Sequence, residues 1–469
     1  MYIDTEYEIF SRMAKVFPNL TEISGKYIDT DGLRALGRLS GSGLSCITFD
    51  YLDTCGKYSL DMAIDGLCKG NPNLKVILFG DDPSDTGPVT DAAVHSIVQY
   101  CPHIEKLSLS DWKNITNLSI SYLTQLSSLR EIDLSCCIRL TSDAVQGLLK
   151  ANRKLEALKL SDANRYDEGE FPALIDNALL RCIGLNCPNL AKLHLRLDAL
   201  DDDSDVTAAS FEAMIKGLPV LSEFLLYDYD KPNSILPMLR IYCPLLKEVS
   251  LDNIACSDAD FTTICQGCPL IESLHLSDLH TLTDPSIVAF ATHCPHLSKI
   301  RLHEVEVTDD SLFILFTSCI HLTSVSLSNL PNITDLSILT LLRCCPRLID
   351  LTLCDNILLT EYCVVAIPVF CPLLESLDVW LMPTLTHETI VQLTRYCKHI
   401  KSLYFYHCDK INNNAVIEIL HNCKYLTKLN IYSTSIHTTE SFISKCDEYI
   451  IKRSKGLRLV YTYTIVNSV

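Results

Sequence analysis

Glycine and tryptophan are scarce in this chain of 469 residues, which contains 16 glycines and 2 tryptophans. The sequence has neither G-x-G-x-x-G nor the P-loop pattern, whose glycines let the backbone approach phosphate groups. It also lacks H-E-x-x-H, which supplies zinc ligands in metalloproteases, and G-x-S-x-G, which carries the nucleophile of serine hydrolases. These absences predict a protein that is not an enzyme and that needs no cofactor and no metal ion.

Positive charge is also in short supply. The chain has 39 Lys and Arg against 57 Asp and Glu, and its formal net charge is −18 at pH 7. Nucleic acids and anionic membranes select basic surfaces, because their phosphates attract lysine and arginine. The charge balance therefore predicts that neither nucleic acid nor a membrane is a partner. A basic segment of another protein remains compatible with it.

Long apolar runs and targeting signals are missing as well. The apolar stretches, such as residues 311–319, are too short to span a bilayer. Residues 1–6 show no basic region followed by an apolar one, which a secretory signal requires. The 23 cysteines follow a repeat, unlike the disulfide framework of a small secreted domain. We therefore expect a reducing compartment, which means the cytoplasm, the nucleus or both.

One sequence repeat extends along the whole chain. The pattern Cys-Pro-x-Ile/Leu-x-x-Leu-x-Leu occurs at residues 268–276, and again at 371–379 with valine in the last place. We give the number 0 to the Ile or Leu in the fourth place of this pattern and count onward from it. From Leu221 to Leu426 these residues follow one another at intervals of 25 or 26, a constancy that is typical of a solenoid. Position 0 falls at Leu20, Leu44, Leu74, Ile104, Leu129, Leu155, Leu190, Leu221, Leu246, Ile271, Leu297, Leu322, Leu348, Leu374, Ile400, Leu426 and Leu457.

Each part of the repeat predicts one structural element. The residues after position 0 alternate between polar and apolar, as in a strand with one buried face. Next comes Ile-Thr-Asp or a variant, whose side-chain oxygens can accept hydrogen bonds from the free N–H groups of a helix start. The helix has apolar residues three and four apart, as at Leu312, Leu315 and Phe316. It ends at Cys-Pro, because proline cannot continue a helix.

Ten cysteines occupy the position three residues before position 0. They allow two interpretations: a ladder of metal or redox ligands, or thiols packed at helix ends as small apolar groups. Cys265 and Cys268 form the one C-x-x-C pair, and no second pair follows at zinc-finger spacing. We favour packing over metal binding. The ten are Cys101, Cys187, Cys243, Cys268, Cys294, Cys319, Cys345, Cys371, Cys397 and Cys423.

The repeat resembles the cysteine-containing subclass of leucine-rich repeats, C-x-x-L-x-x-L-x-L-x-x-C-x-x-I-T-D-x-x-L. Cys137 and Cys408 occupy the second cysteine position of that subclass. The resemblance extends from Leu20 to Leu457. It implies an α/β fold: a leucine-rich-repeat solenoid like the ribonuclease-inhibitor horseshoe, with parallel strands on the concave face and helices on the convex face.

This subclass is similar to the repeat region of F-box/LRR proteins, the substrate receptors of Skp1–cullin–F-box (SCF) ubiquitin ligases. The resemblance implies a non-enzymatic protein-binding module that recognises substrates for ubiquitin-dependent protein catabolism. An F-box would precede the first repeat, where only residues 1–17 stand, so we expect no F-box in this chain. Skp1 is then a partner only if an F-box precedes this chain. The alternative is a stand-alone LRR adaptor or regulatory protein with no ubiquitin-ligase contact.

We expect one solenoid of about 17 repeats over residues 1–469, with residues 1–19 as a partial first repeat and 437–469 as a C-terminal capping segment. Two consecutive repeats are long, and their extra residues, 161–178 and 198–207, form acidic loop insertions. These loops are either solvated or a weak docking patch for a basic segment of the partner. The residues of interest in the second loop are Asp201, Asp202, Asp203 and Asp205.

Aromatic residues gather at the outward positions of the last full repeats. Positions 4 and 6 point away from the leucine core, because successive side chains of a strand alternate between its two faces. Position 6 is Trp380, Tyr406 and Tyr432 in turn, and position 4 is Tyr404 in the middle repeat. Tryptophan and tyrosine are common at the centres of protein interfaces. We therefore predict that these four residues bind a partner protein on the concave face, unless the C-terminal segment of the chain covers them.

Overall fold

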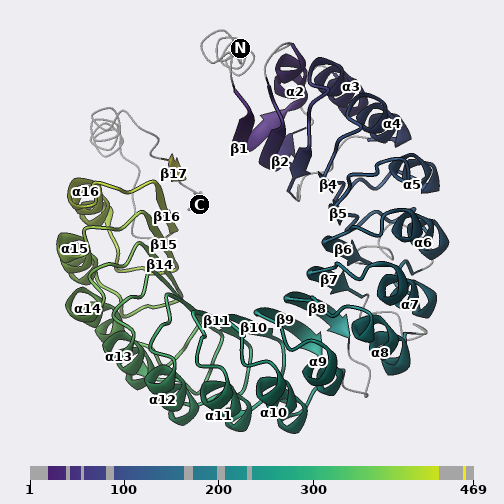
Figure 1. Ribbon diagram of the computed structural model, residues 1–469. Coiled ribbons are helices and arrows are strands. Elements are labelled where there is room, and N and C mark those ends of the chain that lie inside the picture. The colour runs from purple at the N-terminus through teal and green to yellow at the C-terminus, as the bar shows by residue number, and fades with distance from the viewer. Residues whose placement is uncertain are drawn as a thin grey trace, which may run out of the picture. The chain divides into compact units, whose positions relative to one another are not determined.

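The computed structural model describes residues 20–38, 43–53, 58–80, 89–162, 173–197, 206–229, 235–432 and 458–460. The chain divides into two compact units, Met1–Leu246 and Lys247–Val469. In each unit strands and helices alternate along the chain, and the strands form one layer while the helices form the other (Figure 1). This is the α/β leucine-rich-repeat architecture that the sequence predicts.

In the first unit every strand from β1 to β7 pairs in parallel with the next strand along the chain. The strands are β1 (Glu22–Asp29), β2 (Cys46–Asp53), β3 (Val76–Phe79), β4 (Lys106–Ser108), β5 (Glu131–Asp133), β6 (Ala157–Ser161), β7 (Lys192–Arg196) and β8 (Glu223–Tyr229). The helices are α2 (Thr30–Gly37), α3 (Leu60–Gly70), α4 (Asp91–Tyr100), α5 (Asn117–Leu123), α6 (Ser142–Ala151), α7 (Asn177–Asn186), α8 (Ala208–Lys216) and α9 (Leu236–Tyr242).

The second unit repeats the same parallel pairing from β9 to β17. Its strands are β9 (Glu248–Ile254), β10 (Ser273–Ser277), β11 (Lys299–His303), β12 (Ser324–Ser328), β13 (Asp350–Cys354), β14 (Ser376–Trp380), β15 (Ser402–Tyr406), β16 (Lys428–Tyr432) and β17 (Arg458–Val460). Its helices are α10 (Asp258–Gly267), α11 (Asp284–His293), α12 (Asp309–Ser318), α13 (Asp335–Cys344), α14 (Glu361–Phe370), α15 (His387–Tyr396) and α16 (Asn413–Asn422).

The strands lie where the repeat places them. Each strand from β1 to β16 begins two residues after a position-0 residue, as Ser324 follows Leu322. The last strand differs from the expectation: its register pairs Leu459 with Leu429, so Leu459 and not Val460 takes position 3. The predicted position 0 at Leu457 is therefore wrong by one residue, because Leu459 and Val460 are both apolar and either fits position 3 of the pattern.

Apolar side chains from both layers meet between the sheet and the helices. In the repeat of β12, Val325 and Leu327 are at most 1% exposed, and the preceding helix adds Leu315 and Phe316, which are fully buried. Burying a side chain of this size contributes about 2 kcal/mol. Because every repeat supplies the same set, the core is continuous within each unit.

A left-handed residue ends the outward-facing segment of many strands. All ten non-glycine residues with positive φ in the described chain stand at position 7, with φ between 47° and 60°. Six are Asp or Asn, which tolerate this conformation best among residues with a side chain. The N–H of Asp355, for example, donates to the carbonyl oxygen of Trp380 on the next strand. Eight of the ten residues donate in this way, and each extends the sheet by one hydrogen bond.

In many repeats a carboxylate at the helix start is linked to the next repeat. Asp309, the first residue of α12, accepts hydrogen bonds from the N–H of Thr334 (2.9 Å) and from its hydroxyl (2.6 Å). The Thr334 hydroxyl in turn accepts from the N–H of Leu336 and so caps α13. The acid of the Thr-Asp motif therefore serves the following repeat and not its own helix, which corrects the expectation from the sequence. The same pair of hydrogen bonds, from the threonine N–H and hydroxyl to the aspartate, occurs in five other repeats. It joins Thr90 to Asp61, Thr116 to Asp91, Thr283 to Asp258, Thr308 to Asp284 and Thr360 to Asp335.

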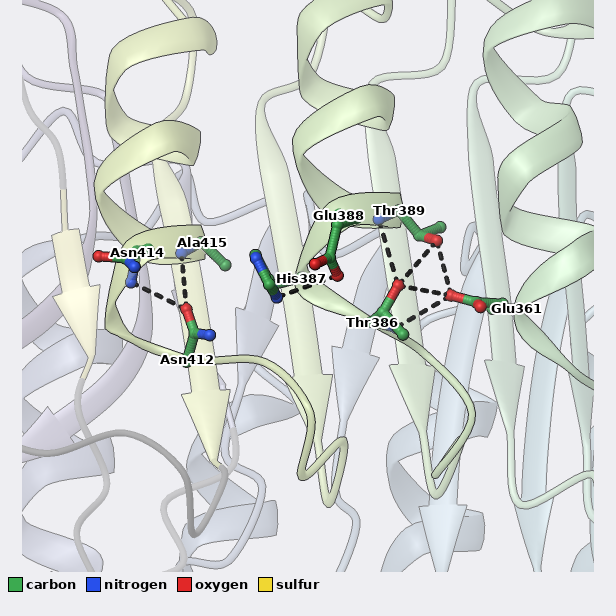
Figure 2. A network of polar contacts seen from close by, with 8 residues as sticks. All are labelled: Glu361, Thr386, His387, Glu388, Thr389, Asn412, Asn414 and Ala415. Atoms are coloured by element: carbon green, nitrogen blue, oxygen red, sulfur yellow. Dashed lines mark hydrogen bonds and ion pairs between the residues drawn. The ribbon is translucent and has the colours of Figure 1, made fainter.

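The series of clamps ends near α15 (Figure 2). Glu361 takes the place of aspartate and accepts from Thr386 and from the hydroxyl of Thr389. The first residue of α15 is His387, which pairs with its neighbour Glu388 at 3.0 Å. The next cap, Asn412, accepts from two N–H groups of its own helix. At the start of α16 an amide, which serves its own helix, thus stands where earlier repeats have a threonine.

We expect Asp309→Asn to lower the free energy of unfolding by about 2 kcal/mol, because the amide replaces a charged acceptor of several partly buried donors. Asp310→Asn is the matched control, since the Asp310 side chain is exposed, and it should change stability by less than about 0.5 kcal/mol. Urea denaturation of both variants at pH 7 measures the difference.

The difference in stability between the wild type and Asp309→Asn should depend on pH. Burial alone would raise the pKa of Asp309, but hydrogen bonds from Ser337 and Thr334 outweigh it and hold the pKa below the ordinary 3.8. The clamp is therefore at full strength above pH 3.8 and is lost as pH falls through the lower folded-state pKa. The stability gap between the wild type and Asp309→Asn should narrow in acid. A gap of equal size at pH 7 and in strong acid would contradict the clamp.

Candidate functional site

The predicted aromatic residues lie on three neighbouring strands of the second unit. In the sheet register Trp380 of β14 is opposite Tyr406 of β15, and Tyr406 is opposite Tyr432 of β16. Trp380 is 42% exposed, whereas the other two and Tyr404 are partly buried. Alternation places all four on the outward side of the strands, because residues 3 and 5 of each repeat are buried in the core.

The rings do not form one uniform row. The centroids of Trp380 and Tyr406 are 4.4 Å apart, with their planes tilted by 43°. Tyr432 instead packs edge-on against His407 of the preceding repeat, at 4.9 Å. Such ring pairs are worth roughly 1 kcal/mol beyond the area they bury. Earlier repeats of this unit carry small or polar residues at position 6, namely Asp252, Ser277, His303, Ser328 and Cys354. Within this unit the aromatic cluster is therefore confined to β14–β16.

A polar row lies beside the rings at position 4. Asp378, Tyr404 and Asn430 are adjacent in the register of β14, β15 and β16. The amide nitrogen of Asn430 donates to the hydroxyl of Tyr406. The Oδ1 atoms of Asp378 and Asn430 are buried and have no hydrogen-bond partner, and they are two of the three such side-chain atoms in the described chain. Buried polar atoms are rarely left unpaired, so this row is an exception that calls for a physical explanation.

The electrostatics of Asp378 set it apart from the acids of the clamps. Burial raises the pKa of its carboxyl to about 6, opposed by a hydrogen bond from the Trp380 side chain. Burial, with the Asp378 charge as a second cause, also raises the pKa of Tyr406. At pH 7 the site thus holds a carboxylate in poorly solvated surroundings.

Leu381, which follows Trp380, adds an exposed apolar side chain in a strained conformation. Its φ is 54° and its side chain is 45% exposed. Leucine is disfavoured at positive φ, where a Cβ approaches the following carbonyl oxygen. Strain of this kind persists mainly at functional sites. The sequence predicted Trp380 as a binding residue but not Leu381. The one signal for Leu381 was the recurrence of Asp and Asn at position 7 of other repeats, which indicates a left-handed backbone conformation there.

Basic residues on the outward strand face of the first unit are paired with acids. His194 and Lys192 lie 2.6 Å and 2.5 Å from Glu223, and Arg196 lies 2.9 Å from Asp228. Hydrogen bonds from His194 and Lys192 lower the pKa of Glu223 to about 2 despite its burial. These pairs leave no open basic surface in this part of β7 and β8.

The predicted acidic loop residues Asp201, Asp202, Asp203 and Asp205 lie outside the described residues. The ends of the other predicted insertion are visible and have structural roles. Asp162 is buried and accepts from the N–H groups of Leu174 and Ile175. Asp176 caps α7 by accepting from the N–H of Leu179.

The cysteine column is packed at the helix ends, as favoured from the sequence. All ten thiols are fully buried, and burial raises the pKa of those for which a shift is resolved, to about 12 at Cys345. The Cys345 thiol donates to the carbonyl oxygens of Phe316 and Cys319 at 3.9 and 3.6 Å. Asn71 stands in the same column and its amide donates to Leu36 and Leu67. The column therefore satisfies carbonyls of helix ends, a role beyond the apolar packing expected.

Within the described residues, one group of three side chains has converging ligand atoms. Asp278, His280 and Glu304 bring these atoms within 4.8 Å of one another. Ser277 already donates to Asp278, and Asn329 donates to Glu304. His280 is exposed, so this group resembles an ordinary polar surface cluster more than a metal centre.

Comparison with known proteins agrees with this architecture. No model of a known protein family matches the chain. One curated relative is the F-box protein MAX2 homolog A of Petunia hybrida, which is 24% identical over 236 residues, or 44% of this chain and 32% of the relative. The match thus spans about a third of that relative's length. A chain of the crystal structure of the Rad7 and Elc1 complex in yeast has a TM-score of 0.58 and 17% identity, covering 76% of this chain and 89% of that one.

The chain is a leucine-rich-repeat solenoid, and it is distantly similar to an F-box protein. Solenoids of this kind are typically protein-interaction modules and not enzymes. Over the described ranges, none of the helices combines the length and apolar character that crossing a membrane requires. The fold and its relatives therefore support a protein-interaction module.

We predict that Leu381→Asn raises the free energy of unfolding by about 1 kcal/mol, because asparagine adopts positive φ at lower cost than leucine. Leu358→Asn is the matched control: Leu358 is 48% exposed and its φ is not positive. Chemical denaturation should show stabilisation for the first variant only. Destabilisation by Leu381→Asn would mean that the leucine side chain contributes to folding.

We predict that Cys294→Ala and Cys345→Ala each cost about 1 kcal/mol or more, because each removes a buried thiol and its bonds to helix-end carbonyls. Metal content, measured by elemental analysis of the purified protein, should be the same in all three proteins. Stoichiometric zinc that disappears in either variant would refute the packing role.

Proposed function

We propose that this chain binds the protein substrate of an F-box-type ubiquitin ligase, and that the outward face of β14–β16 is the binding surface. The observation that carries the proposal is the contact between Trp380 and Tyr406 on a rigid sheet, with the Trp380 side chain 42% exposed. Tyr404 and Tyr432 flank this pair in the register of β15 and β16. The chain acts here by binding, without catalysis of its own.

The surface has the composition of an interface centre. Leu381 and Trp380 expose apolar area side by side, and the sheet beneath them is fixed by parallel pairing on both sides of β14. A partner that covers a tryptophan anchor gains about 2 kcal/mol or more. Little ordering accompanies binding, since the strands already hold these side chains in place.

The ligase assignment is supported by the F-box relative and by the subclass of repeat. In such a ligase the contact with Skp1 would be made by an F-box, and the solenoid would contact the substrate. We also place the protein in the cytoplasm or nucleus, where the buried thiols of the cysteine column stay reduced. A stand-alone adaptor with the same surface is the competing function. Co-purification of the full-length natural protein with Skp1 supports the ligase role, and its failure supports the adaptor.

Cross-linking in cells tests the binding surface and identifies the partner in the same experiment. Benzoylphenylalanine in place of Tyr432 should cross-link the partner, and the same residue in place of Val369 on α14 should not. Trp380→Ala combined with Tyr406→Ala should then weaken binding of the identified partner at least tenfold, measured with purified proteins.

Tyr362→Ala combined with Tyr396→Ala is the matched control. It removes two exposed tyrosines, from α14 and α15, and should leave both affinity and thermal melting unchanged. Equal weakening by both double variants would refute the surface. Early melting of the Trp380 and Tyr406 variant would show that these rings stabilise the fold, for example beneath the C-terminal segment.

A further inference from the structure

Asp378 lacks the cationic partner that Asp133 and Glu223 have on the outward strand face of the first unit. At position 4 of the first unit, Asp133 of β5 is opposite Lys159 of β6 and lies 3.7 Å from it. Glu223 has both Lys192 and His194. By contrast, no ion pair of Asp378 occurs in the described part of the chain.

The neighbours of Asp378 explain this difference. At position 4 its neighbours on the adjacent strands are Thr352 and Tyr404, and Trp380 lies two residues along its own strand. Across β12–β16 no lysine or arginine occupies position 4 or 6. Those positions hold Ser326, Ser328, Thr352, Cys354, Asp378, Trp380, Tyr404, Tyr406, Asn430 and Tyr432. Positions 4 and 6 of β12–β16 therefore supply no cation to this carboxylate.

The two unpaired atoms of the site indicate what would complete it. Oδ1 of Asp378 and Oδ1 of Asn430 are both acceptors, so a ligand must bring hydrogen-bond donors. Aromatic faces attract cations through the negative charge above the ring, and Trp380 and Tyr406 offer such faces. A charged donor also forms the stronger hydrogen bond with a carboxylate.

We propose that Asp378, together with Trp380, Tyr404 and Tyr406, receives a lysine or arginine side chain of the partner protein. The inference rests on the proposed function, because it names the chemistry of the partner at the same surface. A neutral donor would leave the buried carboxylate without a counter-charge. The pKa shifts agree with the geometry: burial raises the pKa of Asp378 to about 6, whereas hydrogen bonds from His194 and Lys192 lower that of Glu223 to about 2.

A short peptide tests the site directly. The chain has two tryptophans, Trp112, which is 3% exposed, and Trp380, so Trp112→Phe leaves Trp380 as the fluorescent reporter. We expect acetyl-Gly-Arg-Gly-amide to change Trp380 emission with an affinity at least tenfold above that of the citrulline peptide. Citrulline has nearly the shape of arginine but no charge. Equal affinities for the two peptides would overturn the proposal.

Two variants in this background remove the cation site in different ways. Asp378→Asn should abolish the preference for arginine while melting no earlier than the parent, since it removes an unpaired buried charge. Thr352→Lys should abolish binding by supplying an internal cation, in the arrangement seen for Asp133 and Lys159. Ser326→Lys, at the same position on β12, is the control and should retain arginine binding. Retained preference in Asp378→Asn would overturn the proposal.

Once cross-linking has identified the partner, its binding to the variants tests this inference separately from the proposed function. Suppose that Trp380→Ala with Tyr406→Ala loses the partner while Asp378→Asn and Thr352→Lys keep it. The strand face then binds its partner without a basic anchor, and the inference is wrong while the function stands. Suppose instead that the arginine preference is found and no strand-face variant affects the partner. The cation site then exists, and the proposed function of this surface is wrong.

Discussion

In most repeats, hydrogen bonds from the cap threonine to a carboxylate of the preceding helix hold the helix layer to the period of the sheet. The sheet fixes the distance between strands through its own ladder, but helices have no such ladder between them. A carboxylate that accepts from both the N–H and the hydroxyl of Thr334 gives the helices an equivalent one. Asn117 and Asn177 keep the contact with an amide in two repeats of the first unit. At α9, by contrast, the cap residue Ile235 makes no side-chain bond, and the first unit ends shortly after that helix.

The period of the repeat was sufficient to predict the strands, the helices and the buried cysteines, because each depends on which residues are apolar and how far apart they stand. Contacts between repeats were harder to predict. Thr-Asp looks like a cap for its own helix, and only the position of the next repeat shows that the acid bonds forward. Tyr432 was placed in the correct column, yet its ring turns to His407, since a column fixes where a side chain starts and not its rotamer. The unpaired atom of Asp378 was likewise invisible in the sequence, because it depends on what three strands present around it.

The outward columns vary while the core stays constant, and this separation lets neighbouring residues decide the chemistry of each position. Glu223 and Asp378 are both acids on the outward strand face, but their pKa values move in opposite directions. The difference comes from the adjacent strands, which offer His194 and Lys192 to one and aromatic rings to the other. A solenoid can thus change what it recognises in one repeat without altering how that repeat folds.

The cysteine column provides thiols whose chemical labelling can report the local opening of individual repeats. Each fully buried thiol belongs to one helix end, and burial keeps it out of reach of reagents. A repeat must open before its thiol can be alkylated, so the rate of labelling at each cysteine follows the opening of that repeat. Mass spectrometry of labelled Cys101, Cys319 and Cys397 would then show how fast each of these repeats opens. The probe is a residue that also donates hydrogen bonds to carbonyls at a helix end.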